Sequence, residues 1–295
     1  MERVLVSGAS GPIGAALLPS LEQAGAEVVR LVRGPAQNAE QISWDPMSDL
    51  SAAAASGFEA VIHLAGESVV GRWTEAKRKV IRESRVRGTE SVAAALALAE
   101  VKARVFVCAS AIGFYGDRGD EILTEVSAGG SGFAADLARD WEAASRIASE
   151  AGIRTVNLRI GLVLSPQGGA LSKMLPAFKM GLGGRLGSGS QWWSWIHVDD
   201  IVGAIHHVIR TESLSGPVNL VAPNAVRNSE FAQVLASVLG RPALLPVPAF
   251  AARLALGEMA QELMLSSQRV EPSKLRASGY EFRFCELRAA LESLV

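Results

Sequence analysis

The chain has few cysteines and almost no net charge. Cys108 and Cys285 are its two cysteines among 295 residues, and they form no CxxC pair. This argues against a disulfide framework or a CxxC zinc site, and two lone thiols in packed, inert positions fit a reducing compartment. The formal net charge is −1 and no lysine- or arginine-rich block occurs, so nothing indicates a nucleic-acid-binding face.

Long apolar runs and metal-binding spacings are also lacking. The nearest approach to a membrane-length run, Pro242 to Ala252, is short and contains three prolines. The N-terminus has no basic stretch of the kind that opens a signal peptide. We therefore expect a cytoplasmic protein with no membrane partner. The four histidines show no HxH or HExxH spacing, so we expect no metal.

Strand-like apolar runs alternate with helical stretches over the first two thirds of the chain. The strand-like runs are residues 3–7, 27–32, 60–64, 104–109 and 155–159, and the helical stretches are 12–24, 75–99 and 132–151. Near-continuous apolar strands between helices indicate a parallel sheet covered on both faces. The sequence therefore predicts an α/β fold with a doubly wound parallel sheet, the Rossmann architecture.

The pattern changes after the last of these strands. Residues 168–189 are glycine-rich and predicted to be irregular, and short helices and strands alternate from there to the C-terminus. We expect a Rossmann domain over residues 1–165, its sheet completed by parts of 190–225. Residues 166–295 mainly form a smaller α+β substrate lobe, with a C-terminal segment from about residue 243.

A glycine pattern, VLVSGASGPIG, follows the first strand and opens the first helix. Gly8 allows a tight turn, Gly11 lets the backbone approach a pyrophosphate, and Gly14 lets the helix pack on the strand. The free N–H groups of the helix N-terminus attract the anion. We expect a dinucleotide to lie against Gly8, Ser10, Gly11, Pro12, Ile13 and Gly14. The alternative is a plain strand–helix turn.

The end of the second strand bears on which dinucleotide binds. An acidic residue there would hold the ribose 2′-hydroxyl of NAD, but the strand ends in Val32 and Arg33 with no acid between Glu27 and Glu40. A guanidinium forms a charge-assisted contact with the 2′-phosphate of NADP. The sequence therefore favours NADP(H), unless Arg33 is only a solvated strand end.

Several motifs in this order resemble the extended short-chain dehydrogenase/reductase superfamily. They are the glycine pattern, HLAGE at 63–67, SRV at 84–86, ASAIGFYG at 109–116 and WIHVDD at 195–200. More narrowly, HLAGE, the SR-containing helix, DWEAA at 140–144 and GLGGRLGSGSQWWSWIH at 181–197 resemble the atypical "epimerase family" branch, family 39U. This branch is NAD-dependent epimerase/dehydratase-like and has a C-terminal domain of unknown function. The resemblance covers the whole chain.

The resemblance implies further cofactor contacts. It places Val32 and Arg33 at the adenosine phosphate, and Arg85 near the cofactor. It also implies Val163 near the nicotinamide. Leu64, Ala65, Gly66 and Glu67 would lie along the dinucleotide. For Arg85 the alternative is a helix-surface residue that pairs with Glu83 or Glu90.

The catalytic set that the resemblance implies is incomplete. Reductases of this superfamily use a Ser to hold the substrate, a Tyr to pass the proton, and a Lys one helical turn later. Ser110 matches the Ser, but Phe133 stands where the Tyr belongs and Leu137 where the Lys belongs. Of the two tyrosines, Tyr115 is the candidate nearest the expected pocket, unless it is a packing residue. General acid–base catalysis, typically worth 10²- to 10⁴-fold, must then come from elsewhere or be absent.

Trp192, Trp195 and His197 are predicted to border the substrate pocket, where the aromatic rings would wall a flat or apolar ligand unless they only pack the lobe.

We expect an NADP(H)-dependent oxidoreductase or epimerase acting on an unknown carbonyl or hydroxyl substrate, as a monomer or homodimer. The alternative is a catalytically inactive, NADP-responsive binding protein. The sequence does not identify the substrate.

Overall fold

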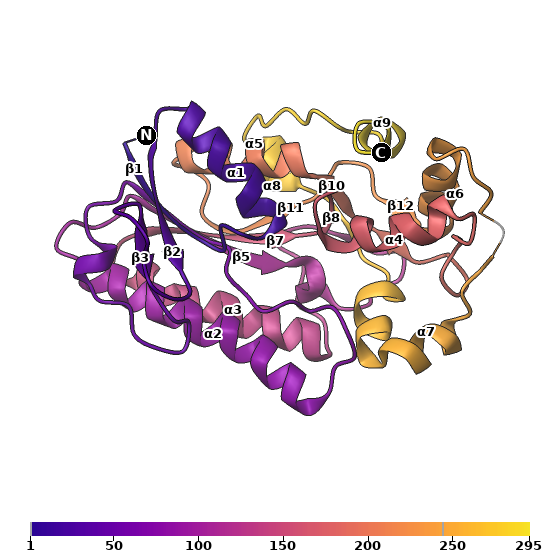
Figure 1. Cartoon of the computed structure of the whole chain (residues 1–295), viewed down its shortest axis with the longest axis horizontal. Coiled ribbons are helices and arrows are strands. Elements are labelled where there is room, and N and C mark those ends of the chain that lie inside the picture. The colour runs from indigo at the N-terminus through magenta and orange to yellow at the C-terminus, as the bar shows by residue number, and fades with distance from the viewer. Residues whose placement is uncertain (1, 244) are drawn as a thin grey trace.

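The centre of the molecule is a seven-stranded parallel sheet (Figure 1). A computed structural model describes residues 2–243 and 245–295. The strands lie in the order β11-β7-β5-β4-β1-β2-β3. They are β1 (Arg3–Ser7), β2 (Glu27–Val32), β3 (Gln41–Ser43), β4 (Ala60–His63), β5 (Val105–Ala111), β7 (Arg154–Ile160) and β11 (Gly216–Leu220).

Helices cover both faces of this sheet, as the near-continuous apolar strands require. In β5, Val105 and Val107 face one hydrophobic cluster, whereas Phe106 and Cys108 face the other. Helices α1 and α5 pack on the first face, and α2 and α3 pack on the second (Figure 1). Their bounds are α1 (Pro12–Gln23), α2 (Glu75–Leu98), α3 (Phe133–Glu150) and α5 (Val198–Arg210). The predicted doubly wound α/β fold is confirmed.

A second hydrophobic core lies beyond the carboxyl edge of the sheet. Buried apolar side chains of α4, α6 and α9 form it together with two tryptophans of β9 and β10. The elements of this region are β8 (Leu162–Leu164), α4 (Gly169–Lys179), β9 (Trp192–Trp193), β10 (Trp195–His197), β12 (Val226–Arg227), α6 (Asn228–Val238), α7 (Ala249–Leu256), a π-helical turn η3 (Ala260–Met264), β13 (Arg269–Val270), α8 (Ser273–Ala277) and α9 (Leu287–Glu292).

The prediction that residues 168–189 are irregular was wrong for the first half of that stretch. Helix α4 forms there, because Leu171, Leu175 and Phe178 recur at helical spacing and bury one face in the second core. The neighbouring glycines made the sequence resemble a loop.

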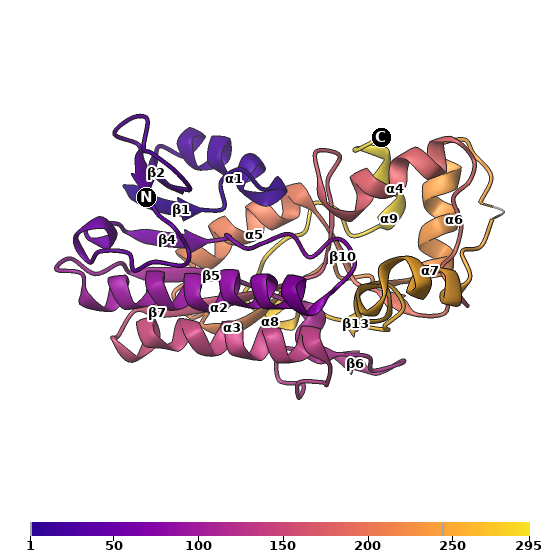
Figure 2. The same cartoon turned by 60° about the horizontal axis from the view of Figure 1, so that its bottom comes forward.

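The two parts of the chain are interlocked. Strand β13, near the C-terminus, pairs in parallel with β6 (Ile122–Leu123), which follows the short 3₁₀ helix η2 (Ile112–Tyr115). Strand β11 returns to the edge of the central sheet after the chain has passed through α4 and α5. Figure 2 shows β6 and β13 close to each other, beside the end of α3. In the part of the chain that the structure describes, no helix combines the length and apolarity needed to cross a bilayer.

Candidate functional site

The glycine loop between β1 and α1 is tightly packed. Gly8 has φ of 73°, and a Cβ there would lie 2.6 Å from the Leu64 carbonyl carbon. A Cβ on Gly14 would lie 2.4 Å from the Gly8 carbonyl oxygen. Both positions therefore exclude a side chain, the first through its left-handed backbone and both through close approach. The loop is held against the segment that follows β4, and a strand–glycine turn–helix unit of this kind is where a Rossmann fold binds a pyrophosphate.

The first turn of α1 offers unpaired N–H groups. Gly11 is the N-cap and no side chain caps the helix. Pro12 occupies the first helical position, where its missing N–H costs nothing. The N–H groups of Ile13 and Gly14 thus remain at the positive end of the helix dipole, where an anion is stabilised.

Three of the predicted cofactor residues contact the same hydrophobic cluster. Ile13, Leu64 and Val163 are partly buried and pack against the cluster on the face of the sheet that α1 and α5 cover. The segment after β8 also approaches the loop, since a Cβ on Gly168 would lie 2.7 Å from the Pro12 ring. The structure therefore brings together residues that are 150 positions apart in sequence.

Charged side chains surround Glu67 at the end of the HLAGE stretch. Lys77 donates to the Glu67 carboxylate at 2.7 Å. This bond, together with the nearby charges of Arg33 and Arg85, holds the pKa of Glu67 below its ordinary value. Glu67 is therefore ionised at neutral pH. Arg33 itself is exposed at the end of β2, one strand away from the glycine loop.

Arg85 lies under the loop that contains Gly66 and Glu67. Its guanidinium donates to the Glu67 carbonyl at 2.9 Å and lies 5.0 Å from the centre of the Trp141 ring. Burial lowers the pKa of Arg85 to about 10, so it stays charged at neutral pH. It pairs with neither Glu83 nor Glu90, the partners considered from sequence. Arg85 supports the loop that the dinucleotide is expected to contact.

His63 is completely buried beneath the same loop. Its Nδ1 lies 2.7 Å from the Ser7 hydroxyl, and its Nε2 has no hydrogen-bond partner among the residues that the structure describes. Burial lowers the pKa of His63 to about 4. The imidazole is therefore neutral and couples β4 to β1 directly under the glycine turn.

Ser110 does not face an open pocket. It is 3% exposed, and its hydroxyl donates to the Glu142 carboxylate of α3 at 2.8 Å. Arg159 of β7 binds both oxygens of the same carboxylate, at 2.8 and 2.9 Å. Ser110 is thus part of a buried ion-pair network between β5, β7 and α3, which gives no support to its expected role as a substrate-binding hydroxyl.

Tyr115 belongs to the same network. It is 0% exposed, and its hydroxyl donates to the Asn219 side chain at 2.6 Å and accepts from Arg159 at 3.0 Å. Burial raises the pKa of Tyr115, against the smaller opposing effect of Arg159. A phenol that is buried, fully bonded and harder to ionise is a packing residue, the alternative that the sequence left open.

Phe133 and Leu137 lie on the first two turns of α3, in a hydrophobic cluster with Trp73 and Met259. The Phe133 and Trp73 rings are 5.0 Å apart, edge to face. The N–H groups of Phe133 and Ala134 donate to the two oxygens of Glu262, at 2.9 and 2.6 Å. A residue from the C-terminal segment thus caps the helix at the place where the resemblance predicts a catalytic Tyr.

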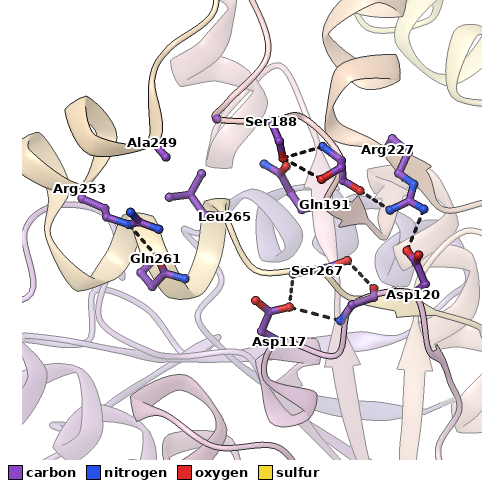
Figure 3. Close-up of a pocket in the computed structure, with 13 residues that line it drawn as sticks. Asp117, Asp120, Ser188, Gln191, Arg227, Ala249, Arg253, Gln261, Leu265 and Ser267 are labelled. Carbon is purple, nitrogen blue, oxygen red and sulfur yellow. Dashed lines mark hydrogen bonds and ion pairs between the residues drawn. The ribbon is translucent and has the colours of Figure 1, made fainter.

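A pocket of about 560 Å³ lies between the two parts of the chain (Figure 3). Asp117 and Asp120 line it from the loop after η2, Arg227 from β12, and Arg253 from α7. Arg227 pairs with Asp120 at 2.8 Å, and Arg253 donates to Gln261 at 2.8 Å. The walls therefore offer polar groups of both charges to a small ligand.

The three residues predicted to border the substrate pocket differ in position. Trp192 lies beside this pocket, since its indole donates to Asp120 at 2.9 Å and its ring stacks under Arg227. Trp195 is fully buried in the second core. His197 is also buried, caps α5 and contacts Phe284. For Trp195 and His197 the structure supports the alternative, packing within the lobe.

Arg159 and Glu262 are structural residues of this site that our sequence reasoning missed. Arg159 had a detectable signal, because a guanidinium in a buried apolar strand requires a charged partner. Glu262 had no such signal in the sequence, because its partners lie more than 120 residues away.

Comparisons with known proteins agree with this geometry. Residues 4–220 match the model of the NAD dependent epimerase/dehydratase family, and residues 247–294 match a domain of unknown function, DUF1731. The chain is 41% identical to an epimerase family protein of Mycobacterium bovis, over 98% of this chain and 96% of that protein. It is 36% identical to the epimerase family protein SDR39U1 of Homo sapiens, over 99% of each chain.

Solved structures show the same relationship. The crystal structure of human SDR39U1 (isoform 2) with NADPH superposes with a TM-score of 0.91 at 35% identity, covering 99% of this chain and 98% of that one. A nucleoside-diphosphate sugar epimerase from Corynebacterium glutamicum gives a TM-score of 0.81 at 36% identity, over 98% of this chain and 57% of that one. With its nicotinamide-dinucleotide-binding fold, the chain belongs to the NAD-dependent epimerase/dehydratase family, and within it resembles the SDR39U1 proteins.

Proposed function

We propose that this protein binds NADP(H) along the carboxyl edge of its sheet and transfers hydride between the nicotinamide and a carbonyl or carbinol carbon of a small molecule. The observation that carries the cofactor assignment is the exposed guanidinium of Arg33 beside a glycine cradle with no acidic residue at the end of β2. The human relative crystallised with NADPH supports it.

The residues present fit such a cofactor. Gly8 and Gly14 leave no room for side chains in the cradle, and the free N–H groups of α1 face the phosphate position. Arg33 would hold the 2′-phosphate, and Ile13, Leu64 and Val163 would form the apolar floor. The bound cofactor supplies the hydride. The pocket of Figure 3 is our candidate place for the substrate.

The cofactor assignment is tested by calorimetry with NADPH and NADH. We expect the wild-type protein to prefer NADPH, and Arg33→Glu to weaken NADPH binding by roughly 10- to 100-fold, equivalent to a charge-assisted contact of about 1.5–3 kcal/mol. NADH affinity should change little. Arg30→Glu, on the same strand but paired with Glu40, is the matched control and should keep the preference. Equal affinity for both coenzymes in the wild type would overturn the assignment.

Hydride transfer is tested by following NADPH absorbance at 340 nm across a panel of carbonyl compounds. We expect at least one compound to be reduced, and the Arg33→Glu variant to lose this activity at limiting NADPH. If NADPH binds tightly but no compound is reduced, and no alcohol is oxidised with NADP, the proposed activity is wrong.

A second candidate function is a catalytically inactive protein that binds a partner in response to NADP(H). The hydroxyls of Ser110 and Tyr115 are buried and bonded within the protein, and this favours it. Pull-downs from lysate with and without NADPH separate the two functions. A partner whose capture depends on NADPH in the wild type, but not in Arg33→Glu, would support this candidate.

A further inference from the structure

Exposed apolar side chains gather at one end of the molecule. Phe250 and Leu254 are one turn apart on α7 and are 71% and 74% exposed. Met180 is 66% exposed at the end of α4. Leu182, Leu245 and Val247 are exposed as well. We call this set, with the segments 179–187, 241–243 and 245–254, the lobe tip.

Segments 179–187 and 245–254 of the lobe tip are held together by backbone contacts. Leu186 and Val247 form a parallel β-bridge, and the Val247 N–H donates to the Arg185 carbonyl at 2.9 Å. A Cβ on Gly184 would lie 2.2 Å from the Leu245 carbonyl oxygen. In both views α7 lies at the end of the molecule remote from the N-terminus and β3 (Figures 1 and 2). Helix α7, which carries Phe250 and Leu254, therefore lies at the opposite end of the protein from β2 and the proposed cofactor position at the end of that strand.

All charged residues of the lobe tip are cations. No Asp or Glu occurs between residues 151 and 198, or between 231 and 257. Lys179, Arg185, Arg241 and Arg253 are exposed there. No ion pair joins any of these four to a carboxylate within residues 2–243 and 245–295. A protein of net charge −1 thus concentrates unpaired positive charge around its most exposed apolar side chains.

This combination discriminates between partners. A nucleic acid would be attracted to the cations, and an unpaired base could stack on Phe250, but the exposed Leu and Met side chains would have no partner on it. A two-fold dimer through this patch would place the same cations of both copies against each other. An anionic lipid surface satisfies both features, because its phosphate and carboxylate groups attract the cations while its interfacial region accepts the apolar side chains.

We propose that the lobe tip docks on the surface of an anionic lipid membrane, with Phe250 and Leu254 entering the interface. The protein would lie on the bilayer and not span it. This departs from the expectation, drawn from the sequence, that the protein has no membrane partner. It rests on exposure and charge and does not depend on hydride transfer, although Gly187, Ala249 and Arg253 of the lobe tip also line the candidate substrate pocket.

Co-sedimentation with vesicles tests the proposal. We expect the full chain to sediment with phosphatidylcholine vesicles that contain roughly one-third phosphatidylserine, and to remain in solution with pure phosphatidylcholine. Binding should weaken as salt is raised. The double variant Phe250→Ser/Leu254→Ser should bind at least tenfold more weakly, and Arg241→Glu should bind more weakly too.

The matched control is Leu98→Ser, which replaces a leucine of equal exposure (77%) at the end of α2. It should sediment like the wild type. Unchanged binding by the double variant, or equal binding to both vesicle types, would overturn the proposal. Lipid-free dimerisation that the double variant abolishes would also overturn it, because the patch would then be covered by a second copy. NADPH binding by calorimetry checks that each variant is folded.

Discussion

At the scale of single residues, the buried His63 beneath the glycine loop makes the stability of the protein depend on pH. Its folded-state pKa of about 4 lies below the ordinary value of 6.5. Between these values the unfolded chain binds more protons than the folded protein, so the free energy of unfolding rises with pH in this window. The neutral ring that bonds Ser7 is thus favoured above about pH 6.5 and opposed by protonation below it.

We predict that acidification from pH 7 to pH 4 removes about 3 kcal/mol of stability through His63 alone. His197, His206 and His207 also have lowered pKa values, and they act in the same direction. The contribution of His63 is therefore measured as the difference in unfolding free energy between the wild type and His63→Gln, each determined by urea unfolding across this pH range. The variant keeps a polar partner for Ser7 but cannot titrate. Parallel pH profiles for the two proteins would contradict the prediction.

The turn and packing roles predicted for Gly8 and Gly14 depend on local geometry. Gly8 has a left-handed φ of 73°, and Gly14 approaches the Gly8 carbonyl within the strand–turn–helix unit, so their spacing was informative. Ser110 was assigned by its position at the end of a strand. Its hydroxyl instead points at Glu142, and which face of a strand a side chain occupies depends on register and on neighbouring helices.

At the scale of elements, α3 depends on a cap supplied from a distant segment. Gly132 precedes the helix and has no side chain to cap it. The carboxylate of Glu262 accepts both first N–H groups and also places a negative charge at the positive helix end.

Glu262→Ala should therefore destabilise the protein by about 1–2 kcal/mol. Thermal unfolding followed by circular dichroism measures this. Glu281→Gln, which removes an exposed carboxylate on the same C-terminal segment, should leave the transition where it is. Equal melting temperatures for Glu262→Ala and the wild type would show that the cap contributes nothing.

Five of the seven strands of the central sheet and the helices α1, α2 and α3 were predictable within a few residues, because apolar runs and periodicity mark them. Helix α4 was not predictable, because Gly168 before it, Gly169 at its first position and Pro176 within it resemble loop signals. Its buried face is set by the second core. The pairing of β13 with β6 was likewise invisible, because two-residue strands carry no periodic pattern.

At the scale of the whole molecule, one family model ends at residue 220 and the other begins at residue 247, but contacts between the two parts join them into one unit. Arg78 of α2 pairs with Glu258 at 2.7 Å, and the Gly71 N–H donates to the Met259 sulfur. Together with the Glu262 cap and the β6–β13 pair, these contacts join the C-terminal segment to the first domain.

We predict that the chain unfolds in one cooperative transition. Calorimetry should give a single peak, and tryptophan fluorescence should follow it, because Trp141 lies in the first domain and Trp193 in the second core. Saturating NADPH should move the whole peak to higher temperature. At a hundredfold excess over the dissociation constant, binding raises the free energy of unfolding by about 2.7 kcal/mol. Two resolved peaks, of which NADPH moves only one, would show independent lobes.

Strand β11 and Glu262 contact the first half of the chain but are synthesised late, and this has a consequence for folding during biosynthesis. The sheet gains its edge strand β11 only after residue 220 leaves the ribosome, and α3 gains its cap only after residue 262. Until then the nascent polypeptide exposes the unpaired side of β7 and the apolar side chains of Phe133 and Leu137, against which Met259 later packs. A chaperone that covers exposed strand edges and apolar side chains would therefore be needed most before these two events are complete.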